Sequence, residues 1–169
     1  MTKRMLAEAK QLDRFIVTEK SVFSVSVRYR EAPYPAYKVG SFEAVQELLG
    51  NLFEEQPYEV VYAVALDNSS RFLGFMKIAE GTVNHANLYL RNILTFLLLD
   101  TNATGLILAH NHPGGTTEPS REDIKLTENL QKKLRDIEVK LLDHVIYVPG
   151  NFGSDAEWVS LLQKGLIPQ

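Results

Sequence analysis

Two histidines and an aspartate lie close together in the chain, within residues 110–113 (HNHP) and 120–123 (SRED). If His110 and His112 end a strand, both project to the same side, because alternate residues of a strand share a face. A proline and two glycines then turn the chain, and Asp123 can return from the first turn of a helix. Two imidazoles and one carboxylate form a typical catalytic zinc site, which keeps its fourth position for water. We therefore predict a zinc site formed by His110, His112 and Asp123.

A hydrolase of this kind also needs a general base, which takes a proton from the attacking water and returns it to the leaving amine. Glu59 is the candidate, because it begins an apolar strand over residues 60–66 that can lie beside the strand leading to His110. Ser120 is the candidate donor of a hydrogen bond to the oxyanion of a tetrahedral intermediate.

Each of these residues also has a simpler interpretation. A histidine is more often a structural residue than a metal ligand, and Glu59 alone resembles an ordinary carboxylate at the end of a strand. Residues 120–123 are close to a capping box, with Ser120 as the N-cap and an acid at the third helical position. The functional interpretation depends on both motifs occurring together. His85 and His144 are not expected to bind the metal, and His144 is expected to have a hydrogen-bonded structural role in an apolar strand.

The composition restricts the class of protein. The chain has 169 residues, 45% of them hydrophobic, which suggests one domain with a short extension. Its net charge of -3 argues against a nucleic-acid binder. The absence of cysteine excludes disulfides, thiolate zinc sites and the Pro-Cys-X-X-Cys motif of zinc nucleobase deaminases. The basic residues of 125–135 alternate with acids and predict a solvated helix face.

No signal peptide opens the chain, and no apolar run approaches the ~20 residues of a membrane span. We therefore expect a soluble, cytoplasmic protein without membrane contact.

The hydrophobic pattern predicts alternating helices and strands. The predicted helices cover residues 4–16, 42–53, 87–99 and 121–136, and a last helix follows a capping box at 154–157. The predicted strands cover residues 23–27, 60–66, 71–79, 106–109 and 139–148. This order predicts an α/β or α+β sandwich, with an N-terminal extension (1–40, a short helix plus a strand) before the main domain (41–169). An edge strand near residues 21–29 is a candidate for pairing between chains, and the oligomeric state stays open.

The spacing His110-X-His112-(X7)-Ser120-X-X-Asp123 resembles the JAMM signature of the JAB/MPN metalloprotease superfamily. More narrowly, the chain resembles the RadC-like branch over roughly residues 40 to 167. The matching runs are Leu66-Asp67, Gly81-Thr82, residues 107–115 (ILAHNHPGG), residues 118–123 (EPSRED), residues 141–146 (LLDHVI) and Gly165-Leu166.

This resemblance implies an MPN/JAB-like sandwich, in which helices flank a curved mixed β-sheet with zinc at its edge. It implies metal-ligand roles for His110, His112 and Asp123, and an oxyanion role for Ser120. It also implies that Glu59, which begins the strand leading to the Leu66-Asp67 turn, is the catalytic base. The alternative bases are Glu54, Glu55 and Glu80.

The implied reaction is zinc-dependent hydrolysis of a peptide or isopeptide bond in a peptide or protein substrate. The alternative is a non-catalytic, DNA-associated or scaffold RadC-like protein linked to DNA repair. Residues 1–40 are too few for the helix-hairpin-helix region of longer RadC proteins, so DNA binding has less support. The chain also departs from the family at residues 90–92, which read Leu-Arg-Asn where Pro-Arg-Glu is usual, and at Gly114, where Ser is common.

Overall fold

The computed structural model describes residues 14–16, 38–54, 56–81, 90–150 and 155–167. These residues contain one six-stranded sheet with strand order β1-β3-β2-β4-β5-β6. The strands are β1 (Arg14–Ile16), β2 (Val60–Leu66), β3 (Phe72–Glu80), β4 (Gly105–Asn111), β5 (Lys140–Val148) and β6 (Glu157–Ser160). The helical segments are α2 (Phe42–Phe53), α3 (Leu90–Thr95), the π-helical η2 (Phe96–Asp100) and α4 (Arg121–Arg135).

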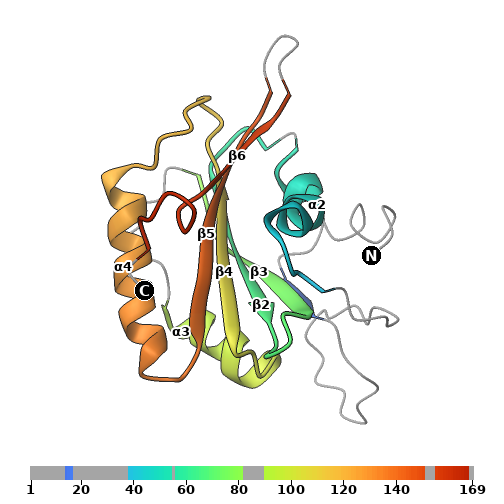
Figure 1. Ribbon diagram of the computed structural model, residues 1–169, viewed down its shortest axis with the longest axis vertical. Helices are drawn as coiled ribbons and strands as arrows, with labels where there is room; N and C mark the ends of the chain where they lie inside the picture. Colours follow the sequence, from blue (N-terminus) through green and yellow to red (C-terminus); the bar gives the residue numbers. More distant parts are fainter. Residues whose placement is uncertain (1–13, 17–37, 55, 82–89, 151–154, 168–169) are drawn as a thin grey trace.

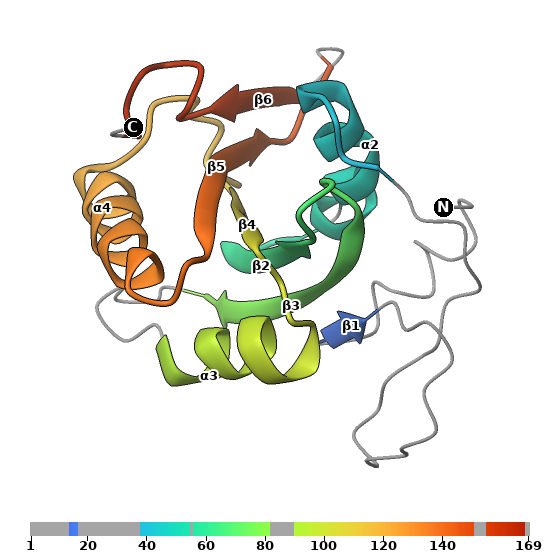
Figure 2. The same cartoon turned by 60° about the horizontal axis from the view of Figure 1, so that its bottom comes forward.

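The sheet is mixed. Neighbouring strands are antiparallel except β4 and β5, which are parallel and are joined through α4. A parallel pair needs such a crossover, because its second strand must restart at the same end of the sheet. The sheet curves around α2, while α3 and α4 lie on its other face (Figures 1 and 2). The predicted α+β fold, a curved mixed sheet flanked by helices, is confirmed.

Each face of the sheet has its own hydrophobic core. Under α2, the Phe53 ring stacks on Tyr147 with ring centroids 5.5 Å apart and meets Tyr62 edge-on at 5.6 Å. On the other face, α3, η2 and α4 cover alternate residues of the same strands, among them Leu106, Leu108 and Val61. Consecutive residues of β2 and β4 therefore serve different cores, so that both strands are buried along their whole length.

Local signals account for several elements. Ser41 caps α2, because its side chain accepts a hydrogen bond from the Ala44 backbone N–H at 3.3 Å. In the turn between β2 and β3, Asp67 Oδ1 accepts hydrogen bonds from the N–H groups of Ser69 and Arg71, both at 2.8 Å. The predicted helices over 42–53 and 121–136 and the predicted strands over 60–66 and 71–79 are confirmed.

Two predicted helices are wrong where the structure can be compared with them. Residues 14–16, the end of the helix predicted over 4–16, form β1 and pair with β3. The last predicted helix is replaced by β6, which pairs with β5. In both places pairing at a sheet edge decides the conformation, and helical periodicity or a capping motif carries no information about that partner. Residues 4–13, the strand predicted at 23–27 and the proposed pairing edge at 21–29 lie outside the described residues.

Of the helix predicted over 87–99, the described residues begin at Leu90 and form α3, which continues as the wider π-helical segment η2. The Thr101 hydroxyl donates to the Phe96 carbonyl at 2.8 Å, which occupies a backbone acceptor at this irregular helix end. Phe96 and Leu97 are buried, whereas Leu99 is 81% exposed, so the end of this segment reaches the surface. In the part of the chain that the structure describes, no helix is long and apolar enough to cross a membrane.

The burial of the α2 face can be tested with matched leucines. Leu49 in α2 is 0% exposed, so Leu49→Ala is expected to lower the free energy of unfolding by about 2–5 kcal/mol through the lost burial and the remaining cavity. Leu99→Ala, at an exposed position, is expected to change it by less than about 0.5 kcal/mol. Denaturant unfolding of both variants measures this difference, and equal losses would contradict the described packing.

Candidate metal centre

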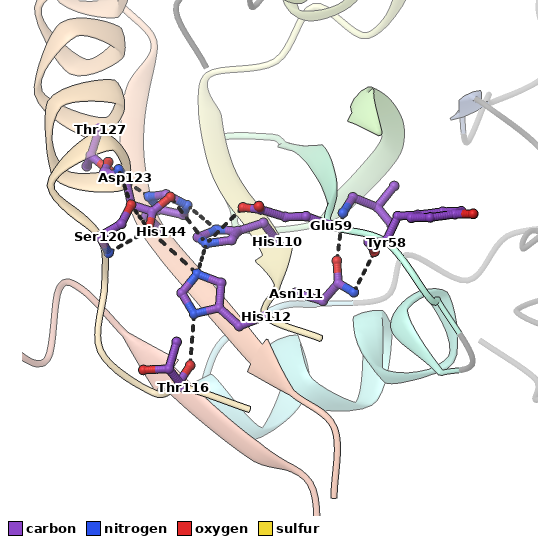
Figure 3. Close-up of polar contacts among 11 residues, drawn as sticks. Tyr58, Glu59, His110, Asn111, His112, Thr116, Ser120, Asp123, Thr127 and His144 are labelled. Atoms are coloured by element: carbon purple, nitrogen blue, oxygen red, sulfur yellow. Dashed lines mark hydrogen bonds and ion pairs between the residues drawn. The ribbon is translucent and has the colours of Figure 1, made fainter. Parts of the chain in front are cut away.

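Four side chains meet where β2 begins and β4 ends (Figure 3). They are Glu59, His110, His112 and Asp123, and one potential ligand atom from each lies within 4.8 Å of the others. His110 and Asp123 are each 1% exposed. The structure therefore brings the three residues predicted as ligands and the predicted base into one group that could hold a metal ion.

The pairing of β2 with β4 accounts for three of these positions. Val61 pairs with His110. Continuing this antiparallel register by two residues places Glu59 opposite His112. Paired residues and alternate residues share a face of the sheet, so Glu59, His110 and His112 project toward the α4 side. His112 follows the last residue of β4, and its backbone N–H donates to the Tyr147 carbonyl of β5 at 2.8 Å, which holds it near the sheet.

The N-terminus of α4 supplies the fourth side chain. Asp123 Oδ2 accepts hydrogen bonds from the Ser120 backbone N–H at 2.7 Å and from the Ser120 hydroxyl at 2.6 Å. The Ser120 oxygen in turn accepts from the Asp123 N–H at 3.1 Å, so the predicted capping box is confirmed. The cap fixes the carboxylate with Oδ1 3.4 Å from His110 Nε2 and Oδ2 3.6 Å from His112 Nε2.

The hydrogen bonds of His112 show which of its nitrogens faces the group. His112 Nδ1 lies 2.8 Å from the Thr116 carbonyl oxygen, which can only accept, so Nδ1 carries the proton. In a neutral ring Nε2 then has a free lone pair. That atom lies 2.9 Å from His110 Nε2 and close to the carboxylates. Imidazole nitrogen and carboxylate oxygen are both common ligands of divalent metals, so the donor set fits a metal ion.

The charges in the group agree with this arrangement. The adjacent Asp123 carboxylate is the largest cause of a raised pKa of His112. For Asp123, burial by itself raises the pKa, but hydrogen bonds with His110, His112 and the Ser120 hydroxyl and the electrostatic interaction with His110 produce a net lowered pKa. Asp123 is therefore ionised, and a negatively charged, buried ligand of this kind favours a cation.

The four candidate bases differ in their positions. Glu59 is in the group, with Oε1 4.0 Å from His110 Nε2 and its side chain 30% exposed. Glu54 follows the end of α2, and Glu80 ends β3, where its carboxylate contacts Lys77. Neither belongs to the group, and Glu55 lies outside the described residues.

Asn111, for which the sequence predicts no role, holds the backbone on both sides of Glu59. Its side-chain oxygen accepts from the Val60 N–H at 2.7 Å, and its side-chain amide donates to the Tyr58 carbonyl at 3.0 Å. The side chain points away from the two flanking histidines, as alternation along the strand requires (Figure 3). The available sequence signal was a polar residue within an apolar strand.

His144, expected to be a hydrogen-bonded structural residue, is 0% exposed and contacts His110 on one side and Thr127 on the other. The expected hydrogen-bonded role of His144 is confirmed. The sequence did not predict that one of its partners is His110.

The fold and this group define a class: an α+β protein with a candidate metal centre at the end of its central strands. Residues 39–166 match the model of the RadC-like JAB domain. A UPF0758 protein of Methylibium petroleiphilum is 36% identical over 152 residues, which are 90% of this chain and 66% of the relative. A UPF0758 protein of Pseudomonas fluorescens is 40% identical over 116 residues, 69% of this chain and 51% of the relative. The chain belongs to the RadC-like JAB domain family, and it spans about half to two thirds of the length of these curated relatives.

The role of Asn111 can be measured without any knowledge of a substrate. Asn111→Ala leaves the buried Val60 N–H without its side-chain acceptor, so the free energy of unfolding is expected to fall by about 1–3 kcal/mol and the Val60 amide to exchange faster with solvent. Asn129→Ala, at an exposed position of α4, is the matched control and should change neither quantity appreciably. An unchanged exchange rate at Val60 in Asn111→Ala would show that Asn111 does not hold this strand.

Proposed function

We propose that this protein is a zinc-dependent metallohydrolase, a peptidase or isopeptidase that uses an activated water. The observation that carries the proposal is the convergence of two imidazoles and two carboxylates at one point where the sheet meets the N-terminus of α4. Membership in the RadC-like JAB domain family supports the same assignment.

The donor set favours zinc over the hard divalent ions. Magnesium and calcium prefer oxygen ligands, whereas two imidazoles and a carboxylate suit zinc. We assign His110, His112 and Asp123 as ligands, because both histidines turn Nε2 toward the group and Asp123 is fixed beside them by its cap. A zinc ion held by three protein ligands lowers the pKa of a water to about 7 and polarises a carbonyl oxygen.

Glu59 is then the general base. Its side chain is 30% exposed, so it can meet water and substrate, whereas Asp123 is buried and engaged in the cap. In this role the Glu59 carboxylate accepts the proton of the attacking water and later gives it to the leaving amine. The Asn111 hydrogen bonds fix the backbone on either side of Glu59, which orients the carboxylate toward the group.

Ser120 is proposed as the donor to the oxyanion. Its hydroxyl hydrogen points to Asp123 Oδ2 in this structure, while the Ser120 N–H also donates to the same oxygen. If the hydroxyl hydrogen turned toward a substrate oxygen, Asp123 Oδ2 would keep the hydrogen bond from the Ser120 backbone N–H, and the Ser120 oxygen would still accept from the Asp123 N–H. Both contacts of the capping box would therefore remain.

The ligand assignment predicts about one zinc ion per wild-type chain by elemental analysis. His112→Ala removes one of the three proposed ligands and is expected to lower the zinc content to near zero after dialysis. Asp136→Ala removes an exposed carboxylate at the other end of α4 and is expected to retain zinc. Equally negligible zinc in the wild type and His112→Ala would refute the metal site.

The assignment of the base predicts that Glu59→Gln retains zinc but loses hydrolysis. Digestion of a peptide library by the zinc-loaded wild type identifies a substrate, and Glu59→Gln is expected to cleave it about 10²–10⁴-fold more slowly. Glu54→Gln and Glu80→Gln are the matched controls and should cleave at the wild-type rate. Unchanged turnover in Glu59→Gln would remove this residue from the role.

The same digestion separates the proposal from its alternative. A DNA-associated or scaffold protein with this fold predicts zinc binding without cleavage of any peptide, together with salt-dependent binding to duplex DNA. Cleavage that depends on both zinc and Glu59 would exclude it.

A further inference from the structure

A continuous chain of buried hydrogen bonds connects two of the proposed ligands from behind. The Thr127 hydroxyl donates to the Asp123 backbone carbonyl at 2.6 Å and lies 2.6 Å from His144 Nδ1. His144 Nε2 lies 2.8 Å from His110 Nδ1. Thr127 and His144 are 0% exposed, and Figure 3 shows both on the side of His110 away from His112.

The donor and the acceptor of each of these hydrogen bonds follow from the contact between Thr127 and the Asp123 carbonyl. A carbonyl oxygen has no proton, so the 2.6 Å contact with Asp123 uses the single hydrogen of the Thr127 hydroxyl. Thr127 must then accept from His144, which places a proton on His144 Nδ1. A neutral His144 accepts at Nε2, so His110 donates from Nδ1 and keeps its lone pair on Nε2.

We propose that His144 and Thr127 are positioning residues that fix His110 in the tautomer able to bind a metal through Nε2. The proposal deepens the function above, and it rests on the metal site but not on hydrolysis. An orienting partner behind a histidine ligand commonly contributes about 10–100-fold in metal affinity. Here the chain runs from the backbone of one ligand, Asp123, to the ring of another, His110, so α4, β5 and β4 are fixed in relation to each other.

The two histidine ligands differ in the partners that orient them. His112 donates to the carbonyl of Thr116, an exposed loop residue, and its ring is partly exposed. His110 Nδ1 instead contacts the side chain of His144, and both His144 and Thr127 behind it are fully buried. A substitution that keeps the volume but removes the hydrogen bonds is therefore expected to affect His110 specifically.

The experiment measures the zinc affinity of the purified 169-residue chain by competition with a chelator. His144→Leu and Thr127→Val remove the hydrogen bonds, and each is expected to weaken binding, by about 10–100-fold for His144→Leu and by less for Thr127→Val. His144→Gln carries an amide oxygen that can accept from His110 Nδ1, and it is expected to recover part of the loss.

Thr101→Val is the matched control. The Thr101 hydroxyl also donates to backbone carbonyls, those of Phe96 and Leu97, at the opposite end of β4 from the site. This variant loses a comparable hydrogen bond, so a general effect on stability would appear in it as well, but its zinc affinity is expected to equal that of the wild type.

A second readout does not involve the metal. The ¹⁵N shifts of the imidazoles distinguish the two neutral tautomers, and in zinc-free wild-type protein at about pH 8 His110 is expected as the Nδ1–H form. In Thr127→Val or His144→Leu the Nε2–H form is expected to gain population. The same tautomer mixture in wild type and variants would overturn the proposal.

The outcomes are separable. Wild-type zinc affinity in a folded His144→Leu, or equal losses in Thr127→Val and Thr101→Val, would overturn the positioning role and leave the zinc site intact. If His144→Leu does not fold, the zinc affinities of Thr127→Val and Thr101→Val are compared instead, and a loss in Thr127→Val alone supports the positioning role. A wild type that binds zinc tightly and cleaves no peptide would refute the hydrolase while the positioning role stands.

Discussion

The register between β2 and β4 is the constraint on which the site depends. Because Val61 pairs with His110, Glu59 and both histidines fall on one face, and Asn111 falls on the other. A slip of one residue would turn all of these side chains to the opposite face. The register is fixed by burial, since every residue of both strands is buried and their alternate side chains fill two different cores. The cores therefore determine the geometry of the polar group.

A second constraint is the capping box of α4. Asp123 stabilises the helix N-terminus through Ser120 and presents its carboxylate to the two histidines. The interpretations of these residues as a helix cap and as a metal ligand were alternatives in the sequence, but they are compatible in the structure. The carboxylate has two oxygens, and the cap uses Oδ2 while Oδ1 lies nearest His110. A helix terminus also favours negative charge, so the same position suits an ionised ligand.

The sequence predicts the parts of the molecule that local patterns determine. The helices over 42–53 and 121–136 and the apolar run of β2 each depend on signals within a few residues, and all three are predicted correctly. The strands β1 and β6 were missed because their conformation depends on β3 and β5, which are distant in the chain. The site divides in the same way. The spacing of His110, His112 and Asp123 is visible in the sequence, whereas the contacts of Asn111 and His144 depend on neighbouring strands.

The buried polar residues at and behind the site lower the stability of the fold unless their hydrogen bonds are made. His110, Asp123, Thr127 and His144 are nearly or fully buried in a face of the sheet that is otherwise apolar. Each such group costs free energy on folding unless its hydrogen bonds are made, and a partly satisfied network is less stable than an apolar core. Thr127, His144 and His110 Nδ1 make their hydrogen bonds with one another. The series ends at His110 Nε2, which faces His112 Nε2 and the carboxylates. A cation at that end would complete the network, so residues that weaken the core for the protein alone would become favourable with the proposed metal bound.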